Sequence, residues 1–246
     1  MKKTLLLTGI LLALLAPTAL AAGGLNINWG TGCWTDGTPL NDLTFACNRN
    51  TGSATITCSF AVSQAQPNFV GIELDLEGAT EPATVPAWWQ AGEGDCRQGV
   101  VSTSANFLAA PQVACTDMWQ NLASGGLAIY AWGPLWGGNN RTHILVVYAV
   151  PADTPIPLTA GVEYYAAQVR ISYAKTVGSG SCAGCEVPML WGFYSMKAAE
   201  LTQYEMLMEV LPNGNQCLRW QHSVLACDRP VPARNSTWGQ VKSLYR

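Results

Sequence analysis

A row of three carboxylates has a spacing that suits chemistry. From Phe69 to Glu77 apolar and polar residues alternate, so that Glu73, Asp75 and Glu77 share one face of an expected strand. Neighbours on such a face lie about 6.6–6.8 Å apart, which suits the carboxylate pair of a glycoside hydrolase. Those enzymes hold their carboxylates in a cleft, whereas the alternation here predicts a solvated outer face. A secreted glycoside hydrolase is therefore kept only as the last alternative.

The two histidines, His143 and His222, lie outside any recognisable catalytic motif. The sequence contains neither Gly-x-Ser-x-Gly nor His-Glu-x-x-His. A Ser-His-Asp set is defined by geometry and can assemble from distant segments, but nothing in the sequence singles one out. No segment has the ligand spacing of a zinc or calcium site. The sequence therefore predicts no catalytic residue, no metal and no cofactor.

A tryptophan-rich loop over residues 132–141 is the strongest indication of a ligand. It combines two tryptophans with glycines and amide side chains. Aromatic rings stack on sugar rings, and amides hydrogen-bond their hydroxyls. The alternative is that the rings pack in the interior, which the spread of ten tryptophans over the chain favours. The residues expected in a glycan site are Tyr130, Trp132, Trp136, Asn140 and Arg141, with Trp88 and Trp89 as neighbours.

The first residues predict export. A basic Met1-Lys2-Lys3 precedes an apolar run and then Ala19-Leu20-Ala21, the pattern of a bacterial Sec signal peptide cleaved near Ala21. We expect residues 1–21 to be removed and residues 22–246 to form one domain, either extracellular or periplasmic. No later stretch approaches the roughly 18 apolar residues that a membrane span needs.

The charge excludes one class of partner. Without Lys2 and Lys3, the chain carries 11 basic residues against 16 acidic ones, and the basic residues do not cluster. Nucleic-acid binding depends on a basic surface and is therefore not expected. The expected partner is an unknown extracellular protein or a glycan.

Nine cysteines predict a disulfide framework in an oxidising compartment. Their spacing favours local pairs, with Cys58 left as a buried free thiol because it shares a strand face with Ile56, Phe60 and Val62. Cys182-Ala183-Gly184-Cys185 also has the spacing of a redox motif or of half a zinc site, but it leads into a strand-like segment. The expected pairs are Cys33 with Cys47, Cys96 with Cys115, Cys182 with Cys185, and Cys217 with Cys227.

The chain alternates with a period of two over most of its length. This pattern predicts an all-β fold, a two-sheet antiparallel β-sandwich of Ig-like or cohesin-like type with local disulfides. Short helical turns are expected at residues 84–90 and 116–122, and a short amphipathic segment at 237–246. Residues 212–215 are expected to turn strand 203–211 into a hairpin with 216–222. The other expected strands are 54–62, 69–77, 127–132, 143–150, 162–173 and 187–197.

Several segments resemble an uncharacterised family of secreted bacterial proteins, a resemblance that implies no known activity. They are Leu25-Asn26-Ile27-Asn28-Trp29 with Cys33, Phe45-Ala46-Cys47-Asn48, Val85-Pro86-Ala87-Trp88-Trp89, Cys182-Ala183-Gly184-Cys185 and residues 238–246. The middle of the chain also resembles a cohesin-type sandwich, through strand 68–77 and the lead 158–161 into 164–173. No calcium loop of the dockerin type accompanies it, so cohesin function is not carried over.

Taken together, these features favour a secreted, non-catalytic extracellular module that is structural or interacts with proteins. A carbohydrate-binding module that uses the tryptophan-rich loop is the first alternative.

Overall fold

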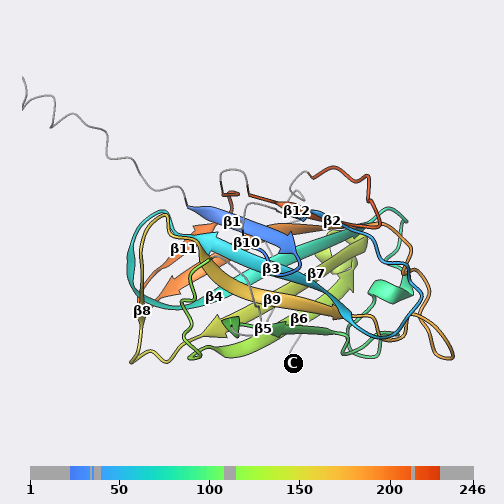
Figure 1. Ribbon diagram of the computed structural model, residues 1–246, viewed down its shortest axis with the longest axis horizontal. Coiled ribbons are helices and arrows are strands. Elements are labelled where there is room, and N and C mark those ends of the chain that lie inside the picture. Colours follow the sequence, from blue (N-terminus) through green and yellow to red (C-terminus); the bar gives the residue numbers. More distant parts are fainter. Residues whose placement is uncertain (1–22, 34, 36–39, 108–114, 212–213, 228–246) are drawn as a thin grey trace, which may run out of the picture.

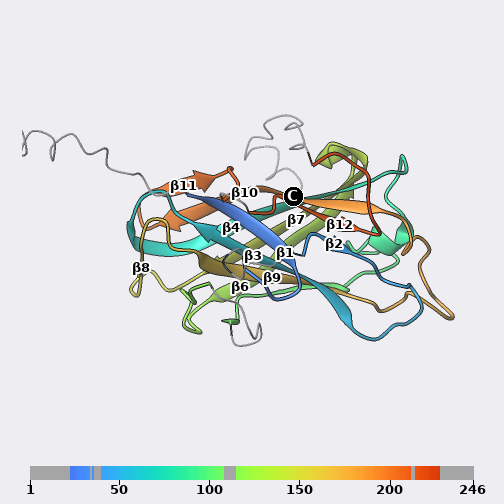
Figure 2. The ribbon, with the colours of Figure 1, turned by 45° about the horizontal axis from the view of Figure 1, so that its top comes forward.

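Two β-sheets form the layers of a sandwich in the computed structural model, which describes residues 23–33, 35, 40–107, 115–211 and 214–227 (Figures 1 and 2). The expected signal peptide and the C-terminal segment 237–246 lie outside these residues. The smaller sheet holds, in spatial order, β1 (Gly24–Trp29), β3 (Ser53–Ala61), β9 (Tyr164–Ser172) and β5 (Val101–Ser104). The all-β sandwich-like prediction is confirmed.

The larger sheet has eight strands. Its main path runs β2 (Asp42–Leu43), β12 (Cys217–Trp220), β10 (Met189–Glu200), β4 (Gln66–Thr80), β7 (Gly138–Ala149) and β6 (Ser124–Gly133). In addition, β11 (Tyr204–Leu207) pairs with β10, and β8 (Ile156–Leu158) pairs with β4. The pair β2–β12 is parallel, whereas the other strand pairs of the described chain are antiparallel.

The apolar face of β4 points into the core, as its alternating sequence predicts. Ile72, Leu74 and Leu76 are buried in the core between the sheets, and Glu73, Asp75 and Glu77 face away from it. Because β4 pairs with β10 on one side and β7 on the other, this acidic row runs along the middle of the larger sheet.

In β3 the predicted inward face of Cys58 is confirmed. The opposite face, which alternation alone would leave open to solvent, is buried as well. Cys58 is a buried free thiol, and burial raises its pKa. Thr57 and Ser59, on the other face, are also buried. Their hydroxyls donate to Gly30 O at 2.6 Å and to Glu163 Oε1 at 2.5 Å. Strand alternation gives the face of a side chain but does not show whether another segment covers that face.

Three of the four expected disulfide pairs are wrong. The structure joins Cys33 to Cys115, Cys47 to Cys185 and Cys96 to Cys182, and only Cys217–Cys227 is confirmed. The three long bridges span 82, 138 and 86 residues. Long-range strand pairing brings together loops that are far apart in sequence, so the nearest cysteine along the chain is not the nearest in space. The disulfide framework is therefore not local.

Gly184 lies between Cys182 and Cys185 at a position that requires glycine. Its φ is +100°, a left-handed conformation that favours glycine, and a Cβ there would lie 2.3 Å from Pro86 Cβ. Cys182 and Cys185 are both half-cystines in separate bridges. The redox and zinc interpretations of this motif are therefore wrong.

Four disulfides fit a protein that folds in an oxidising compartment. Within the described residues, no helix combines the length and hydropathy needed for a membrane span.

Two further expectations about local structure need correction. The turn expected around Trp88 and Trp89 is present as η2 (Ala87–Trp89). Residues 116–122 are not helical, because Asp117 Oδ1 accepts from the Trp119 and Gln120 amides and closes a turn instead. The strands β11 and β12 do not form a hairpin with each other, since each pairs with a different part of β10.

Arg97 is a fully buried cation that connects η2 to the smaller sheet. Its guanidinium lies 3.6 Å from the centre of the Trp88 ring and donates to Trp88 O at 2.7 Å. It also donates to Ala174 O at 3.1 Å and to Ser172 O. Burial lowers its pKa to about 10, so the side chain stays charged near neutral pH. Three carbonyl groups of two chain segments therefore share one cation.

We expect Arg97→Met to lower the free energy of unfolding by about 2–4 kcal/mol, because buried carbonyl groups lose their donor while most of the volume is kept. Urea unfolding of the oxidised protein measures this change. Arg170→Met, which removes an exposed arginine from β9, is the control and should change stability by less than about 0.5 kcal/mol. Equal midpoints for the two variants would show that the Arg97 contacts contribute little.

Candidate functional site

Two of the five aromatic residues expected in a glycan site lie in the interior. Trp88 and Trp89 are 0% and 2% exposed. Their ring centres lie 5.2 Å from Trp220 and 5.7 Å from Trp191, respectively. No ligand reaches these rings from solvent, so the prediction that Trp88 and Trp89 line the site is wrong.

Tyr130 and Trp132 also have structural partners. Both project from β6 on the side of the buried residues Ile144 and Thr142 of β7. Tyr130 donates its hydroxyl to Trp89 O at 2.5 Å, and Trp132 Nε1 donates to Asp95 Oδ2 at 2.9 Å. The two side chains therefore fix residues 89–95 against β6 and leave the predicted site.

Trp136 is the predicted ring that lies over the outer face of the larger sheet. It belongs to η4 (Pro134–Trp136), which connects β6 to β7 between two left-handed glycines, Gly133 and Gly137. Its ring stacks on His143, with 4.1 Å between centres and 10° between planes. Trp136 is half-buried, and its neighbour Leu135 is 76% exposed.

Beneath Trp136, His143 meets the acidic row of β4. His143 pairs across the sheet with Glu77, and its Nδ1 lies 3.0 Å from Asp75 Oδ1. Farther along, Glu73 Oε1 lies 3.1 Å from Lys197 Nζ of β10. His143 belongs to no catalytic motif, and the pairing register that brings it to Asp75 has no signal in the sequence.

Burial shifts the pKa values of Asp75, His143 and Glu77. It raises the pKa of Asp75 to about 8, with a further contribution from Glu77, and lowers the pKa of His143 to about 4. Burial also raises the pKa of Glu77, while Arg141 opposes that shift. Although 3.0 Å is an ion-pair distance, burial favours the neutral forms of both Asp75 and His143. Near neutral pH the contact therefore carries no net charge.

With a pKa raised to about 8, Asp75 has the protonation state of a general acid near neutral pH, but little of its side chain is accessible. The Asp75 side chain is 21% exposed and lies against His143, and the row follows the outer face of the sheet. The last alternative, a glycoside hydrolase, requires a cleft around these carboxylates and remains a prediction. Asn140 uses its amide nitrogen on Thr80 O at 3.0 Å, and therefore positions the loop.

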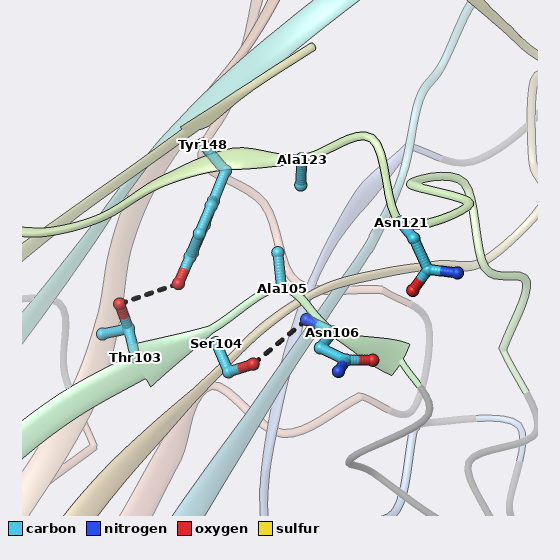
Figure 3. A pocket seen from close by; sticks show the side chains of 7 residues that line it. All are labelled: Thr103, Ser104, Ala105, Asn106, Asn121, Ala123 and Tyr148. Atoms are coloured by element: carbon cyan, nitrogen blue, oxygen red, sulfur yellow. Dashed lines mark hydrogen bonds between the residues drawn. The ribbon is translucent and has the colours of Figure 1, made fainter.

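A separate hollow of about 280 Å³ lies where β5 approaches the start of β6 (Figure 3). The Tyr148 hydroxyl lies 3.0 Å from Thr103 Oγ1, and the Ser104 hydroxyl accepts from the Asn106 amide. None of the residues expected in a site lines this hollow. Its lining is uncharged and consists of Thr103, Ser104, Ala105, Asn106, Asn121, Ala123 and Tyr148.

The raised pKa of Asp75 predicts a loss of stability between about pH 6.5 and 8. An unfolded carboxyl titrates near 4, so between about 4 and 8 folded Asp75 keeps a proton that the unfolded chain has lost, and stability falls as pH rises. His143 acts in the opposite sense, but only between about 4 and 6.5. The fall from pH 6.5 to 8 should be on the order of 1–2 kcal/mol.

Urea unfolding at the two pH values, with ionic strength held constant, measures this fall. Asp75→Asn removes the titrating carboxyl and should remove most of the slope. Glu73→Gln, which alters the carboxylate next to Lys197, should keep it. An unchanged slope in Asp75→Asn would assign the titration to another group, such as Glu77, whose pKa burial also raises.

No family model matches this chain, and none of the curated proteins compared with it matches in sequence. Its function therefore rests on the geometry of its own surface.

Proposed function

We propose that the protein is an extracellular binding module that holds a glycan, without converting it, against the outer face of the larger sheet at Trp136. The stacking of Trp136 on His143, 4.1 Å apart and nearly parallel, carries this proposal. A ring fixed before the ligand arrives loses little conformational freedom on binding. His143 covers one face of the ring, so a sugar would approach its other face and its edges.

The groups on the same outer face as Trp136 include both hydrogen-bond donors and hydrogen-bond acceptors. Glu77 on β4 is an acceptor and Arg141 on β7 is a donor, and Arg141 partly opposes the burial-raised pKa of Glu77. The Glu73–Lys197 pair continues the same face. Sugar hydroxyls donate and accept hydrogen bonds, so a mixed row beside an aromatic platform suits a chain of sugar residues.

Trp136→Ala should weaken glycan binding at least about tenfold, a loss of about 1.4 kcal/mol, while leaving the fold intact because the ring is half-exposed. Tryptophan fluorescence of the oxidised protein, titrated with soluble β-glucan, xylan, mannan and pectin, measures the affinity. Tyr204→Ala removes an exposed ring from β11 and is the control that should bind normally. A flat response of the parent protein to all four polysaccharides would overturn the proposal.

A protein-interacting module is the second candidate, and an apolar strip on β11 favours it. Leu201, Tyr204, Met206 and Met208 are exposed, and Tyr204 and Met206 lie opposite Ala199 and Lys197 of β10. Edge strands with exposed apolar side chains are suited to pairing with another strand. We take a second copy of this chain as the partner, because two identical edges can pair around a two-fold axis.

Met206→Lys should then abolish self-association, because a charge would face the apolar strip of the second copy. Sedimentation velocity over a rising protein concentration measures the oligomeric state. Leu135→Lys changes an exposed apolar residue elsewhere and should leave dimerisation unchanged. A parent protein that stays monomeric at every concentration would contradict this second candidate.

A further inference from the structure

We propose that Thr44, His222 and Asp42 form a nucleophilic site that cleaves carboxylic esters. The three residues lie at the β2 edge of the larger sheet, the edge opposite β6 in the strand order (Figure 1). The proposal is independent of glycan binding at Trp136, because Trp136 belongs to the connection between β6 and β7.

The parallel pairing of β2 with β12 brings the residues together. Asp42 pairs with Arg219 and Leu43 with Trp220, so both chains leave the sheet at the same end. In an antiparallel pair they would leave at opposite ends. Asp42 and Thr44 are two residues apart along an extended segment, which places their side chains on one side of it.

A left-handed turn then returns His222 over that side. Gln221 and His222 follow β12 with φ values of +54° and +57°, a conformation that is uncommon for residues other than glycine. Gln221 Nε2 donates to Phe45 O at 2.5 Å, and the Cys217–Cys227 disulfide closes the segment that contains the turn. The position of His222 is therefore determined by a strand pair, a hydrogen bond and a covalent bridge.

The three side chains form a directed hydrogen-bond chain. His222 Nδ1 lies 2.7 Å from Asp42 Oδ2, and His222 Nε2 lies 2.9 Å from Thr44 Oγ1. An ionised carboxylate only accepts, so Nδ1 carries the imidazole proton and Nε2 presents its lone pair. The Thr44 hydroxyl therefore donates to Nε2. This is the relation of nucleophile, base and orienting acid found in hydroxyl-based acyl transfer.

The exposure of this group suits a reaction with a substrate that reaches the surface. The His222 side chain is 73% exposed. Hydrogen bonds between groups that water reaches contribute little to stability. Structural need alone therefore does not account for two aligned bonds and two consecutive left-handed residues at this edge.

The proposed reaction has two balanced steps. Thr44 Oγ attacks the ester carbonyl carbon as its proton passes to His222 Nε2; the bond from carbon to the alkoxy oxygen breaks, and the departing alcohol takes that proton. Water then attacks the acyl-threonine and gives a proton to Nε2, which returns it to Thr44 Oγ as the carboxylic acid leaves. No oxidant, metal or cofactor enters either step.

Covalent labelling tests the nucleophile directly. A fluorophosphonate probe should form a Thr44 Oγ–phosphorus bond with loss of fluoride, and peptide mass spectrometry of the oxidised protein would locate it. We expect labelling to fall at least about tenfold, or about 1.4 kcal/mol in barrier, in His222→Gln and Asp42→Asn. Thr44→Ser should still be labelled, at the new hydroxyl. Thr202→Val, which removes an exposed hydroxyl after β10, should be labelled like the parent.

Hydrolysis of 4-nitrophenyl acetate separates this site from simple imidazole catalysis. If the proposal holds, Thr44→Val and His222→Gln lose the protein-dependent rate together. A rate that survives Thr44→Val but not His222→Gln would overturn it in favour of imidazole acting alone. Absence of a Thr44 adduct in the folded parent protein would also overturn it. Thermal unfolding of each variant shows whether a lost reaction reflects lost structure.

Discussion

The burial of Arg97 against Trp88 is the interaction on which the interior at this end of the sandwich depends. A buried cation is costly unless its charge is balanced, and here the balance comes from the Trp88 ring, the Trp88 carbonyl group and two backbone carbonyl groups near the end of β9. Since η2 is held to the smaller sheet in this way, Trp88 and Trp89 reach Trp220 and Trp191 of the larger sheet. Tyr130 and Trp132 secure the same segment from β6. One loop therefore connects both layers, and six aromatic side chains, four of them the buried tryptophans named above, pack in or against it.

Because these aromatic side chains pack in the interior, they are not available to bind a ligand at the surface. A tryptophan that supports the interior cannot also stack on a sugar, so the aromatic content of the chain overstates the size of a glycan site. Trp136 differs because its loop turns back over the outer face and its ring rests on His143. Burial favours the neutral forms of His143 and Asp75, so the surface directly beneath the ring carries no net charge near neutral pH. Charge on this face is then concentrated in the flanking groups Glu77, Arg141, Glu73 and Lys197, which are the ones able to meet a ligand.

The features that could be predicted from the sequence are those that depend on residues close together in the chain. Features that depend on contacts between distant segments could not be predicted. The alternation in β4 and β3 gave the inward face of each strand and the buried Cys58 thiol, because side-chain direction repeats every two residues. Disulfide pairing and the meeting of His143 with Asp75 depend on strand order and register, which the alternation of a single strand does not contain. The burial of Trp88 was weighed correctly as packing, but its link to Arg97 had no signal, since a lone arginine in a glycine-rich loop resembles any solvated cation. Thr44, His222 and Asp42 were missed because about 180 residues separate them along the chain.

Strand pairing also explains why the two proposed sites differ, since one lies over the middle strands of the larger sheet and the other lies at its β2 edge. In the middle of the larger sheet each strand is paired on both sides, so its outer face offers side chains in fixed rows, a geometry suited to an extended ligand. At the β2 edge the parallel pair ends, and the chain that follows each strand is released at the same end. Turns there are free to adopt left-handed conformations and to bring a histidine to a hydroxyl and a carboxylate, which a regular antiparallel ladder would hold apart. The row of side chains proposed to bind a glycan thus depends on antiparallel pairing in the middle of the sheet. The converging side chains proposed to cleave an ester depend on the parallel pair at its edge.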